Sequence, residues 1–300
     1  MKAKTKKKVF FKEIMKKPII AIMYDFDKTL CTRDMQEYTF IPSVGMDAND
    51  FWDLTAKVGE EEQMDSILTY MYCMIDKANN AGTPLKREAL VACGKDIEYH
   101  PGVEGWFERI NAYAKDAGVK VEHYVLSSGL KEIIEGTSIA KYFKRIYACE
   151  FLYKDGYAVW PKTAVNYTNK TQFVYRINKG VLDIHNDVDL NNSRPDYDRR
   201  VLFSNMIYIG DGLTDVPCMK LVKQSGGHSI AIYHKGQEGK AAPLLKHERV
   251  DWMFEADYRK GSGLDKIMKL LIENLAYYNK LKGLNFKQRK NISAEPEVKN

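Results

Sequence analysis

The sequence lacks any long hydrophobic run. No apolar stretch of the 300-residue chain approaches the ~20 residues that a helix needs to cross a bilayer. The first residues, MKAKTKKKVFFK, are basic but contain neither a long apolar core nor a small-residue cleavage site, so we do not expect a secretory signal peptide. We therefore predict a cytoplasmic protein with no membrane partner.

Cysteine is also scarce. The chain holds five cysteines, at Cys31, Cys73, Cys93, Cys149 and Cys218. Their number is odd, they are scattered, and no two of them form a C-x-x-C pair. This pattern argues against a disulfide framework and against a zinc knuckle. It agrees with a protein of a reducing compartment.

A net acidic charge is missing as well, because the chain carries a formal charge of +6. Much of the excess lies in residues 1–17, which include Lys2, Lys4, Lys6, Lys7 and Lys8. A lysine run of this kind can bind nucleic acid or anionic lipid. A frayed, solvated arm is the commoner outcome. We expect a basic lead-in of that kind, and we do not expect nucleic acid as a partner.

What the chain does contain is a buried-type strand that ends in two carboxylates. Residues 19–24, IIAIMY, form a short continuous apolar run, which is typical of a strand buried on both faces of a parallel sheet. Asp25 and Asp27 follow it directly. Because ligands of open α/β sheets bind beyond the carboxyl ends of strands, these acids would share a proton or hold a hard cation such as Mg2+. The alternative is an Asp-rich turn without chemistry.

Between this turn and residue 99 the pattern changes. Apolar residues recur at helical spacing, for example at Met64, Ile67, Leu68, Met71 and Ile75, and no strand alternation is present. The stretch is too long for a plain connection. We therefore predict a mostly helical inserted domain over residues 32–99.

A serine-rich junction follows the next strand. Residues 119–126 are predicted to form that strand, Ser127, Ser128 and Gly129 come next, and a helix is expected from about Leu130. Hydroxyl groups and free backbone N–H groups at such a junction can bind an anion. A plain serine N-cap is the alternative.

A strand over residues 145–151 and a hairpin are expected further on. Asp155 and Gly156 stand between aromatic, β-prone residues, which indicates a tight turn. The hairpin would form a small flap over residues 151–160. It is too short to form a cap domain of its own.

The helix that follows carries a lysine at each end. It is expected from Asn169, an N-cap with Gln172 three residues on, to Gly180. Lys179 lies in the last turn, where the helix dipole favours a cation, whereas Lys170 lies in the first turn. The position of Lys170 therefore suggests a purpose other than helix stability.

Residues 183–200 are polar and rich in Asp and Asn. Their acids are spaced loosely like those of a calcium loop, but Asn192 occupies the position that requires glycine. We therefore expect a solvated loop here.

A further strand, residues 205–209, ends in Gly210-Asp211-Gly212-Leu213-Thr214-Asp215. It again delivers acids to the carboxyl edge of the sheet. Shorter strands are expected at residues 229–233 and 250–254. A helix is expected at residues 263–281, and the charged end is expected to be disordered.

Together these motifs place Asp25, Asp27, Ser127, Lys170 and Asp211 after successive α/β elements. This is what a combined phosphate and metal site requires. Three clustered acids would not all remain ionised beside a single lysine, so Mg2+ is the expected cofactor.

The order of the motifs resembles that of a known family. DFDKTL, VLSSG, a lone lysine and GDGLTD resemble the four motifs of the haloacid dehalogenase (HAD) superfamily of aspartyl-phosphate phosphohydrolases, from about residue 18 to 260 outside the insert. The resemblance implies a Rossmann-like three-layer α/β/α core with a mainly parallel sheet. It also implies that the helical insert is a type 1 (C1) cap, as in the phosphoserine phosphatase branch. The expected division is a lead-in (1–17), a core domain (18–31 and 100–282), a cap domain (32–99) and a disordered tail (283–300).

The resemblance also implies roles for the acids. Asp25 matches the nucleophile that forms an aspartyl-phosphate, and Asp27 matches the general acid/base. Asp211 would bind Mg2+ together with Asp25 and the backbone carbonyl of Asp27. Asp215 would be a further acid that binds the metal or supports its ligands.

The remaining motif positions would bind phosphate. Ser127, with the N–H of Ser128 or Gly129, would hold phosphoryl oxygens, and Lys170 would balance charge between the phosphoryl group and the nucleophile. Lys179 and Lys162 remain alternatives for that lysine.

The expected function is Mg2+-dependent hydrolysis of a small phosphorylated metabolite. The superfamily's dehalogenases lack the second aspartate, so Asp27 favours phosphate esters. The insert offers only Arg33 and Arg87 as arginines, which leaves a serine-phosphate substrate unsupported. A phosphotransferase or phosphomutase on the same scaffold is the first alternative, and a non-catalytic regulatory or nucleic-acid-binding protein is the second. A homodimer is left open.

Overall fold

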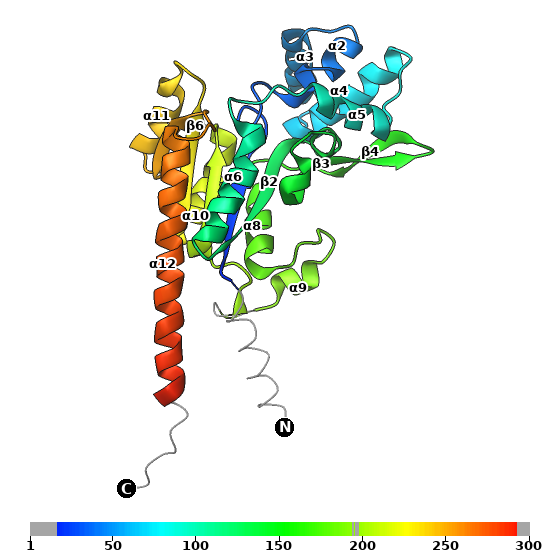
Figure 1. Ribbon diagram of the computed structural model, residues 1–300. Coiled ribbons are helices and arrows are strands. Elements are labelled where there is room, and N and C mark those ends of the chain that lie inside the picture. The colour runs from blue at the N-terminus through cyan, green and yellow to red at the C-terminus, as the bar shows by residue number, and fades with distance from the viewer. Residues whose placement is uncertain (1–16, 194, 196–197, 293–300) are drawn as a thin grey trace.

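The computed structural model describes residues 17–193, 195 and 198–292 (Figure 1). Nearly all of the predicted N-terminal lead-in, and residues 293–300 of the predicted tail, lie outside this range. Among the described residues, no helix is long and apolar enough to span a membrane. All five cysteines lie within the range and are buried free thiols.

A seven-stranded sheet forms the centre of the molecule, in the order β4-β3-β2-β1-β5-β6-β7. Its strands are β1 (Ile19–Tyr24), β2 (Lys120–Leu130), β3 (Phe143–Lys154), β4 (Tyr157–Thr163), β5 (Met206–Gly210), β6 (His228–Tyr233) and β7 (Trp252–Glu255). Every neighbouring pair is parallel except β3 and β4. The predicted α/β class with a mainly parallel sheet is therefore confirmed.

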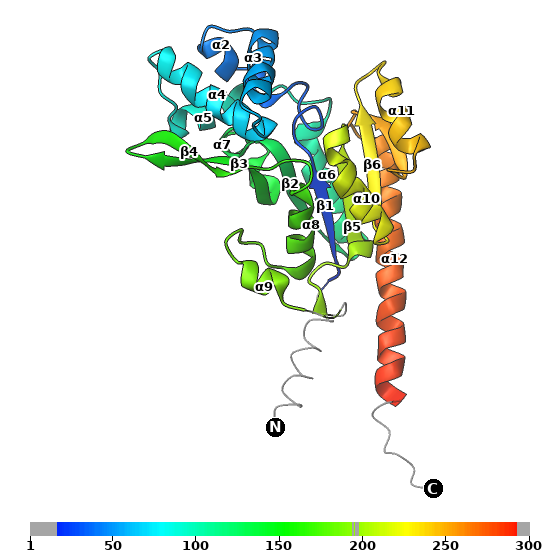
Figure 2. The same ribbon diagram turned by 180° about the vertical axis from the view of Figure 1, so that it is seen from behind.

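Helices cover both faces of this sheet. One face carries α6 (Val103–Asp116) and α12 (Gly263–Ile292), and the other carries α8 (Lys170–Lys179) and α10 (Val216–Gln224) (Figures 1 and 2). Smaller helices are α7 (Lys131–Glu135), α9 (Asp187–Asn191) and α11 (Glu238–Lys246). Short 3-10 turns are η1 (Met35–Glu37), η2 (Gly94–Asp96), η3 (Ala140–Tyr142), η5 (Phe203–Asn205) and η6 (Leu213–Asp215). The continuous apolar run of β1 is explained by this layering, because residues 20–24 are completely buried between the two helical layers.

The insert between β1 and α6 is helical and lies beyond the carboxyl end of β1 (Figure 2). It consists of α2 (Phe40–Ser43), α3 (Ala48–Glu61), α4 (Ser66–Asn80) and α5 (Arg87–Cys93). Asp47 and Asp65 begin the two long helices, because each side chain accepts hydrogen bonds from first-turn N–H groups. A β-bridge between Cys31 and Tyr99 joins the two chain segments that lead into and out of the insert.

The predicted hairpin is present and extends the sheet. Asp155 and Gly156 have φ angles of 52° and 85°, as the tight turn requires. The flap is not free, however, because the N–H of Ala158 donates to the carbonyl of Leu85 at 2.9 Å. The hairpin therefore packs against the helical insert through this backbone hydrogen bond.

The predicted end of the second strand at residue 126 was wrong. Strand β2 continues through the Ser127-Ser128-Gly129 segment to Leu130, with an irregular register against β3, and α7 begins one residue later. Residues 183–200 are not simply a loop. They contain α9, which is capped by Asn186 and tied to the buried Arg176 through Asp187 at 2.6 Å.

The predicted disordered tail was also wrong in part, because residues 283–292 belong to α12. This helix is 30 residues long, and its C-terminal end extends past the described core in both views (Figures 1 and 2). The division into core and cap domains remains a proposal.

A buried carboxylate on β2 gives a stability prediction. Glu122 accepts hydrogen bonds from Arg200 at 2.7 Å, from Tyr124 at 2.6 Å and from Lys120 at 2.9 Å. Burial opposes ionisation, but these donors outweigh it and lower the pKa of Glu122 from 4.5 to about 2. A depressed folded-state pKa stabilises the fold fully above the unfolded value and loses that contribution as pH falls through the folded value.

Replacing Glu122 with Gln is therefore expected to lower the free energy of unfolding by about 1–3 kcal/mol at pH 7. The difference from wild type should shrink as pH falls from about 4.5 towards about 2. Urea unfolding at pH 7 and pH 3 measures both values, with the exposed Glu60→Gln as control. A deficit that is equal at both pH values would contradict the assignment.

Candidate active site

Three carboxylates meet at the carboxyl edge of the sheet. Asp25 follows β1, Asp211 follows β5 and Asp215 ends η6, and one oxygen from each lies within 4.8 Å of the others. The neighbouring parallel strands cause this convergence, since the N–H of Asp25 donates to the carbonyl of Ile209 at 2.9 Å. The structure thus brings together three of the four residues predicted as metal ligands.

Lys170 lies against two of these acids. Its Nζ donates to Oδ1 of Asp25 and to Oδ1 of Asp215, both at 2.9 Å, and the residue is 1% exposed. Lys179 instead donates to backbone carbonyls that include that of Asn192, and Lys162 pairs with Glu150 at 2.8 Å. Of the three candidate lysines, Lys170 is the one at the acids.

The cluster of three carboxylates and Lys170 carries more potential negative charge than positive charge. Burial and the charge of Asp215 raise the pKa of Asp25 to about 7, although Lys170 lowers it. Burial and the charge of Asp25 raise the pKa of Asp211 to about 8. The same acids raise the pKa of Lys170 despite its burial, so this lysine remains a cation. One lysine does not compensate three clustered carboxylates.

The cluster fits a divalent cation of the Mg2+ type. All three side chains offer oxygen ligands, which Mg2+ prefers, and burial together with the neighbouring acids raises the pKa of Asp25 and of Asp211. A cation bound here would favour the ionised acids.

Asp27 lies in the same loop, but its carboxylate is not part of the three-acid group. Its Oδ1 accepts a hydrogen bond from the N–H of Met35 at 2.8 Å. Burial, followed by the charges of Asp34 and Asp25, raises its pKa well above the usual value. A carboxyl group that holds its proton near neutral pH can act as a general acid. The predicted metal contact of Asp27 is through its backbone carbonyl. The hydrogen bond from Met35 engages the side chain of Asp27 and not that carbonyl.

The serine-rich segment of β2 lies against Asp27. A side chain on Gly129 would place its Cβ 2.6 Å from Oδ2 of Asp27 and 2.2 Å from Cε of Met35, so only glycine fits at this approach. Ser127 is buried, and its Oγ accepts a hydrogen bond from the N–H of Gly129 at 2.9 Å. The Oγ of Ser128 is buried without a hydrogen-bond partner among the described residues. The predicted phosphate-binding residues therefore lie beside the predicted acids.

Tyr208 and Gly210 support Asp215 from β5. The hydroxyl of Tyr208 donates to Oδ1 of Asp215 at 2.7 Å. A Cβ on Gly210 would lie 2.3 Å from Oδ2 of the same carboxylate. Gly210, directly before Asp211, leaves room for the carboxylate of Asp215, and Tyr208, two positions before Gly210, donates to it. The sequence analysis missed Tyr208, although it lies on the strand that delivers Asp211.

The helical insert reaches the site through Tyr70 on α4. Its hydroxyl donates to the carbonyl of Ser128 at 2.7 Å, and its ring packs edge-on against Trp52 at 6.2 Å. Trp52 Nε1 in turn donates to Glu37 at 2.9 Å. The helical spacing of Ile67, Leu68, Met71 and Ile75 predicted this helix but did not single out Tyr70 or its contact with the serine segment. The sequence near Met35 likewise gave no indication that its backbone N–H would donate to Asp27.

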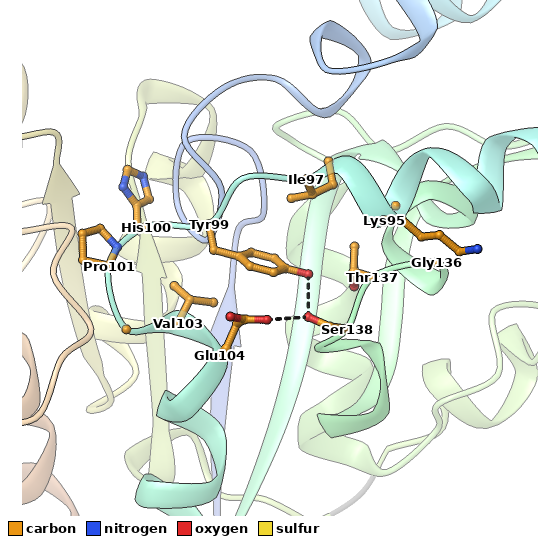
Figure 3. A pocket seen from close by; sticks show the side chains of 12 residues that line it. Lys95, Ile97, Tyr99, His100, Pro101, Val103, Glu104, Gly136, Thr137 and Ser138 are labelled. Carbon is orange, nitrogen blue, oxygen red and sulfur yellow. Dashed lines mark hydrogen bonds between the residues drawn. The ribbon is translucent and has the colours of Figure 1, made fainter.

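A separate cavity of about 680 Å3 lies behind the segment that joins the insert to α6 (Figure 3). Tyr99 and Glu104 both meet the hydroxyl of Ser138 there, at 3.2 Å each. None of the acids of the cluster lines this cavity. Its lining comes from residues 94–104, which lead from the insert into α6, and from residues 136–138 of the core.

Comparisons with known proteins agree with this geometry. Residues 22–220 match the family model of haloacid dehalogenase-like hydrolases. An uncharacterised protein of Borreliella burgdorferi is 28% identical over 276 residues, which covers 82% of this chain and 94% of the relative.

Two solved structures show the same fold. A HAD family hydrolase from Salmonella enterica serovar Typhi has a TM-score of 0.56 at 16% identity, covering 85% of this chain and 72% of that one. A phosphoserine phosphatase carrying a phospho-aspartyl intermediate analogue has a TM-score of 0.52 at 17% identity, covering 85% of this chain and 99% of that one.

Proposed function

Because the chain belongs to the haloacid dehalogenase-like hydrolases, we propose that it is a phosphatase that hydrolyses small phosphomonoesters through an aspartyl-phosphate on Asp25, with Mg2+ as cofactor. The observation that carries this proposal is the position of Lys170, which bridges Asp25 and Asp215 at 2.9 Å each. A buried cation that touches one oxygen of Asp25 fixes the carboxylate and favours its ionised form against the burial that raises its pKa. Hydrolysis by an activated carboxylate requires that state.

Asp25 would attack phosphorus with a carboxylate oxygen and displace the substrate alkoxide. Asp27, whose pKa is raised by burial and by the charges of Asp34 and Asp25, would give a proton to that alkoxide. It would then take a proton from the water that attacks the aspartyl-phosphate, so that both steps balance. The hydrogen bond from Met35 to Asp27 would aim the carboxyl group in both steps.

The remaining residues would bind and orient the phosphoryl group. Ser127, with the N–H of Ser128 or Gly129, would hold its oxygens, and Lys170 would balance the charge that develops. Asp25, Asp211 and Asp215 would hold Mg2+, which supplies positive charge to the phosphoryl oxygens. The helical insert would exclude water from the cleft and select the leaving group.

The test is phosphate release from p-nitrophenyl phosphate and from a panel of phosphorylated metabolites, with Mg2+ and with EDTA. Release that requires Mg2+ supports the proposal. Equal release of alcohol and phosphate separates a hydrolase from a phosphotransferase, because a transferase would release alcohol in excess of phosphate when an acceptor is added. Release that is unchanged by EDTA, or no release from any compound of the panel, would refute the proposal.

Tyr70 provides a prediction for the insert. Tyr70→Phe removes its hydrogen bond to the carbonyl of Ser128, which also accepts from Cys149 at 3.2 Å and so keeps a partner. We expect kcat/KM to fall about 5–10-fold, because a hydrogen bond worth about 1 kcal/mol no longer holds the insert against the serine segment. The free energy of unfolding should change by less than about 1 kcal/mol. Tyr72→Phe, at an exposed position of the same helix, is the control, and equal kinetics of both variants would contradict the assigned contact.

A further inference from the structure

Helix α12 presents an apolar row to solvent on the side opposite its core contacts. Leu270, Tyr277, Leu281 and Leu284 are 60%, 68%, 65% and 52% exposed. On the other side of the helix, Met268, Ile272 and Leu275 are buried in the core. The helix lies at the outer margin of the molecule in both views (Figures 1 and 2), so this row faces away from the body. Four large apolar side chains in one exposed row indicate a binding surface.

The row has the spacing of a coiled coil. Leu270, Tyr277 and Leu284 are seven residues apart and occupy one core position of successive heptads. Asn274 and Leu281, which follow Leu270 and Tyr277 by four residues, occupy the other core position. A single Asn among apolar core residues is a device that fixes register in coiled coils. The occupant that this pattern fits is another helix with the same pattern.

The charges beside the row favour a second copy of this chain in the antiparallel direction. Glu273 and Lys280 precede Asn274 and Leu281 by one residue each, so they flank the row at equivalent heptad positions. Lys280 is exposed, whereas Glu273 is half-buried and accepts a hydrogen bond from the hydroxyl of Tyr113 through Oε1, so its other oxygen would meet the second copy. If Leu270 of one copy faces Leu281 of the other, then Tyr277 faces Asn274. In that register Glu273 of one copy lies beside Lys280 of the other, and two-fold symmetry forms the pair twice.

The projecting C-terminal end of the helix would also be stabilised by a packing partner. The C-terminal end of the helix projects from the body of the molecule (Figure 1), and the helix contains Gly283, a residue that disfavours helix. Helical segments of this length without tertiary contacts are marginal in water. A second helix packed on the row would supply those contacts.

We propose that α12 forms an antiparallel two-helix interface with a second copy of this chain, with Leu270 of each copy packed against Leu281 of the other. The two bodies then lie on opposite sides of the helix pair. None of the residues of the row belongs to the acid cluster.

The first test is the mass of the full-length protein in solution, measured by size-exclusion chromatography with light scattering over a range of concentrations. Wild type is expected to be a dimer. Leu281→Lys should raise the dimer dissociation constant at least about 100-fold, because the substitution loses two buried leucine contacts per dimer. Leu152→Lys, which alters a leucine that is 49% exposed on β3, is the matched control and should remain dimeric. Circular dichroism checks that both variants are folded.

The second test determines whether the two α12 helices pack in the antiparallel or the parallel direction. Because the native cysteines are buried, cysteines introduced at the row form disulfides selectively. An equimolar mixture of Leu270→Cys and Leu281→Cys chains should give a disulfide-linked heterodimer, whereas Leu270→Cys alone should give little. Lys280→Glu should weaken the dimer about 5-fold or more through repulsion by Glu273, and the double variant Lys280→Glu/Glu273→Lys should recover it.

Several results would overturn the proposal. They are a monomeric wild type at all concentrations, a dimer that Leu281→Lys leaves intact, and efficient disulfide formation by Leu270→Cys alone. Association of the monomer with anionic vesicles or nucleic acid through the same row would also overturn it in favour of those partners.

Discussion

Asp25→Asn is expected to lower Mg2+-dependent phosphate release by at least about 10^4-fold. The carboxamide has no anionic oxygen with which to attack phosphorus, so neither the first step nor the covalent intermediate remains available. Binding of the phosphate ester should persist, because Ser127 and Lys170 are unchanged. The measurement is steady-state phosphate release by purified wild type and variant under identical conditions.

The same substitution should not harm the fold. Asn keeps an acceptor oxygen for the Nζ of Lys170, which lies 2.9 Å from Oδ1 of Asp25, and it removes one of three buried acids. The pKa of Asp25, raised to about 7, shows that its ionised form is disfavoured in the metal-free protein. We therefore expect the metal-free variant to have a Tm equal to or above that of wild type. Loss of activity together with a large loss of Tm would mean that Asp25 supports the structure instead.

Asp183→Asn is the matched control for this variant. Asp183 is an exposed acid that pairs with Arg145 at 2.7 Å, far from the cluster along the chain. Its replacement should leave activity within about 2-fold of wild type, since exposed ion pairs contribute little. Residual activity of Asp25→Asn above about 1% of wild type would remove Asp25 from the role of nucleophile.

Lys170→Met is expected to cause the largest loss of stability in the metal-free protein, about 3–5 kcal/mol. The methionine has a similar shape but no charge. It leaves Asp25 and Asp215 without the cation that lies 2.9 Å from each. Because the pKa of Lys170 is raised in the folded protein, its stabilising effect is fully present below the ordinary lysine pKa and is lost only as pH rises through the folded value.

The loss should therefore be similar at pH 6 and pH 8, apart from the titration of the acids themselves. Added Mg2+ should recover part of it, because the cation would compensate the same carboxylates. Activity should fall by at least about 10^3-fold even where Mg2+ restores the fold. Chemical unfolding with and without Mg2+ gives the first quantity, and phosphate release gives the second.

Lys179→Met distinguishes this account from a general effect of losing a helix lysine. Lys179 lies at the other end of α8 and donates to backbone carbonyls, one of them that of Asn192 at 3.1 Å. Its replacement should cost about 1 kcal/mol and leave kcat within about 2-fold. If Lys179→Met abolished activity and Lys170→Met did not, the assignment of the lysine would be wrong.

The strand ends were predictable from sequence because their signal is local. A continuous apolar run followed by an acid marks both β1 with Asp25 and β5 with Asp211, and parallel neighbours bring such ends together. The position of Lys170 was predictable for a similar reason, since a cation in the first turn of a helix works against the dipole. Its actual partners, Asp25 and Asp215, explain why it is there.

Contacts between distant segments left no such signal. Tyr70 meets Ser128 across 58 positions of sequence, and Met35 meets Leu130 across 95. Helical spacing identified the helix that contains Tyr70. It did not show which side chain of that helix would donate a hydrogen bond to a backbone carbonyl of another segment. The irregular pairing that continues β2 through Ser127 to Leu130 likewise depends on β3, so the strand appeared to end at the serines.

The end of α12 was missed for a compositional reason. Residues 283–292 include Gly283 and many polar residues, which are typical of a tail rather than of a helix packed on a core. Leu281 and Leu284 are exposed on this part of the helix, and the proposed interface would supply the packing surface that the monomer does not. The periodicity of that row was present in the sequence, but its direction relative to the core required the structure.

The most direct test of the central claim is to trap the phosphorylated enzyme. Asp27→Asn should slow hydrolysis of the intermediate, because the water loses its base. Acid quenching during turnover of a good substrate with Mg2+, followed by mass spectrometry of the digested protein, then locates the phosphoryl group. The account predicts one phosphoryl group on the peptide that contains Asp25, labile to hydroxylamine and absent in Asp25→Asn/Asp27→Asn. A phosphoryl group on any other residue, or turnover by Asp27→Asn with no phosphorylated protein at any quench time, would contradict it.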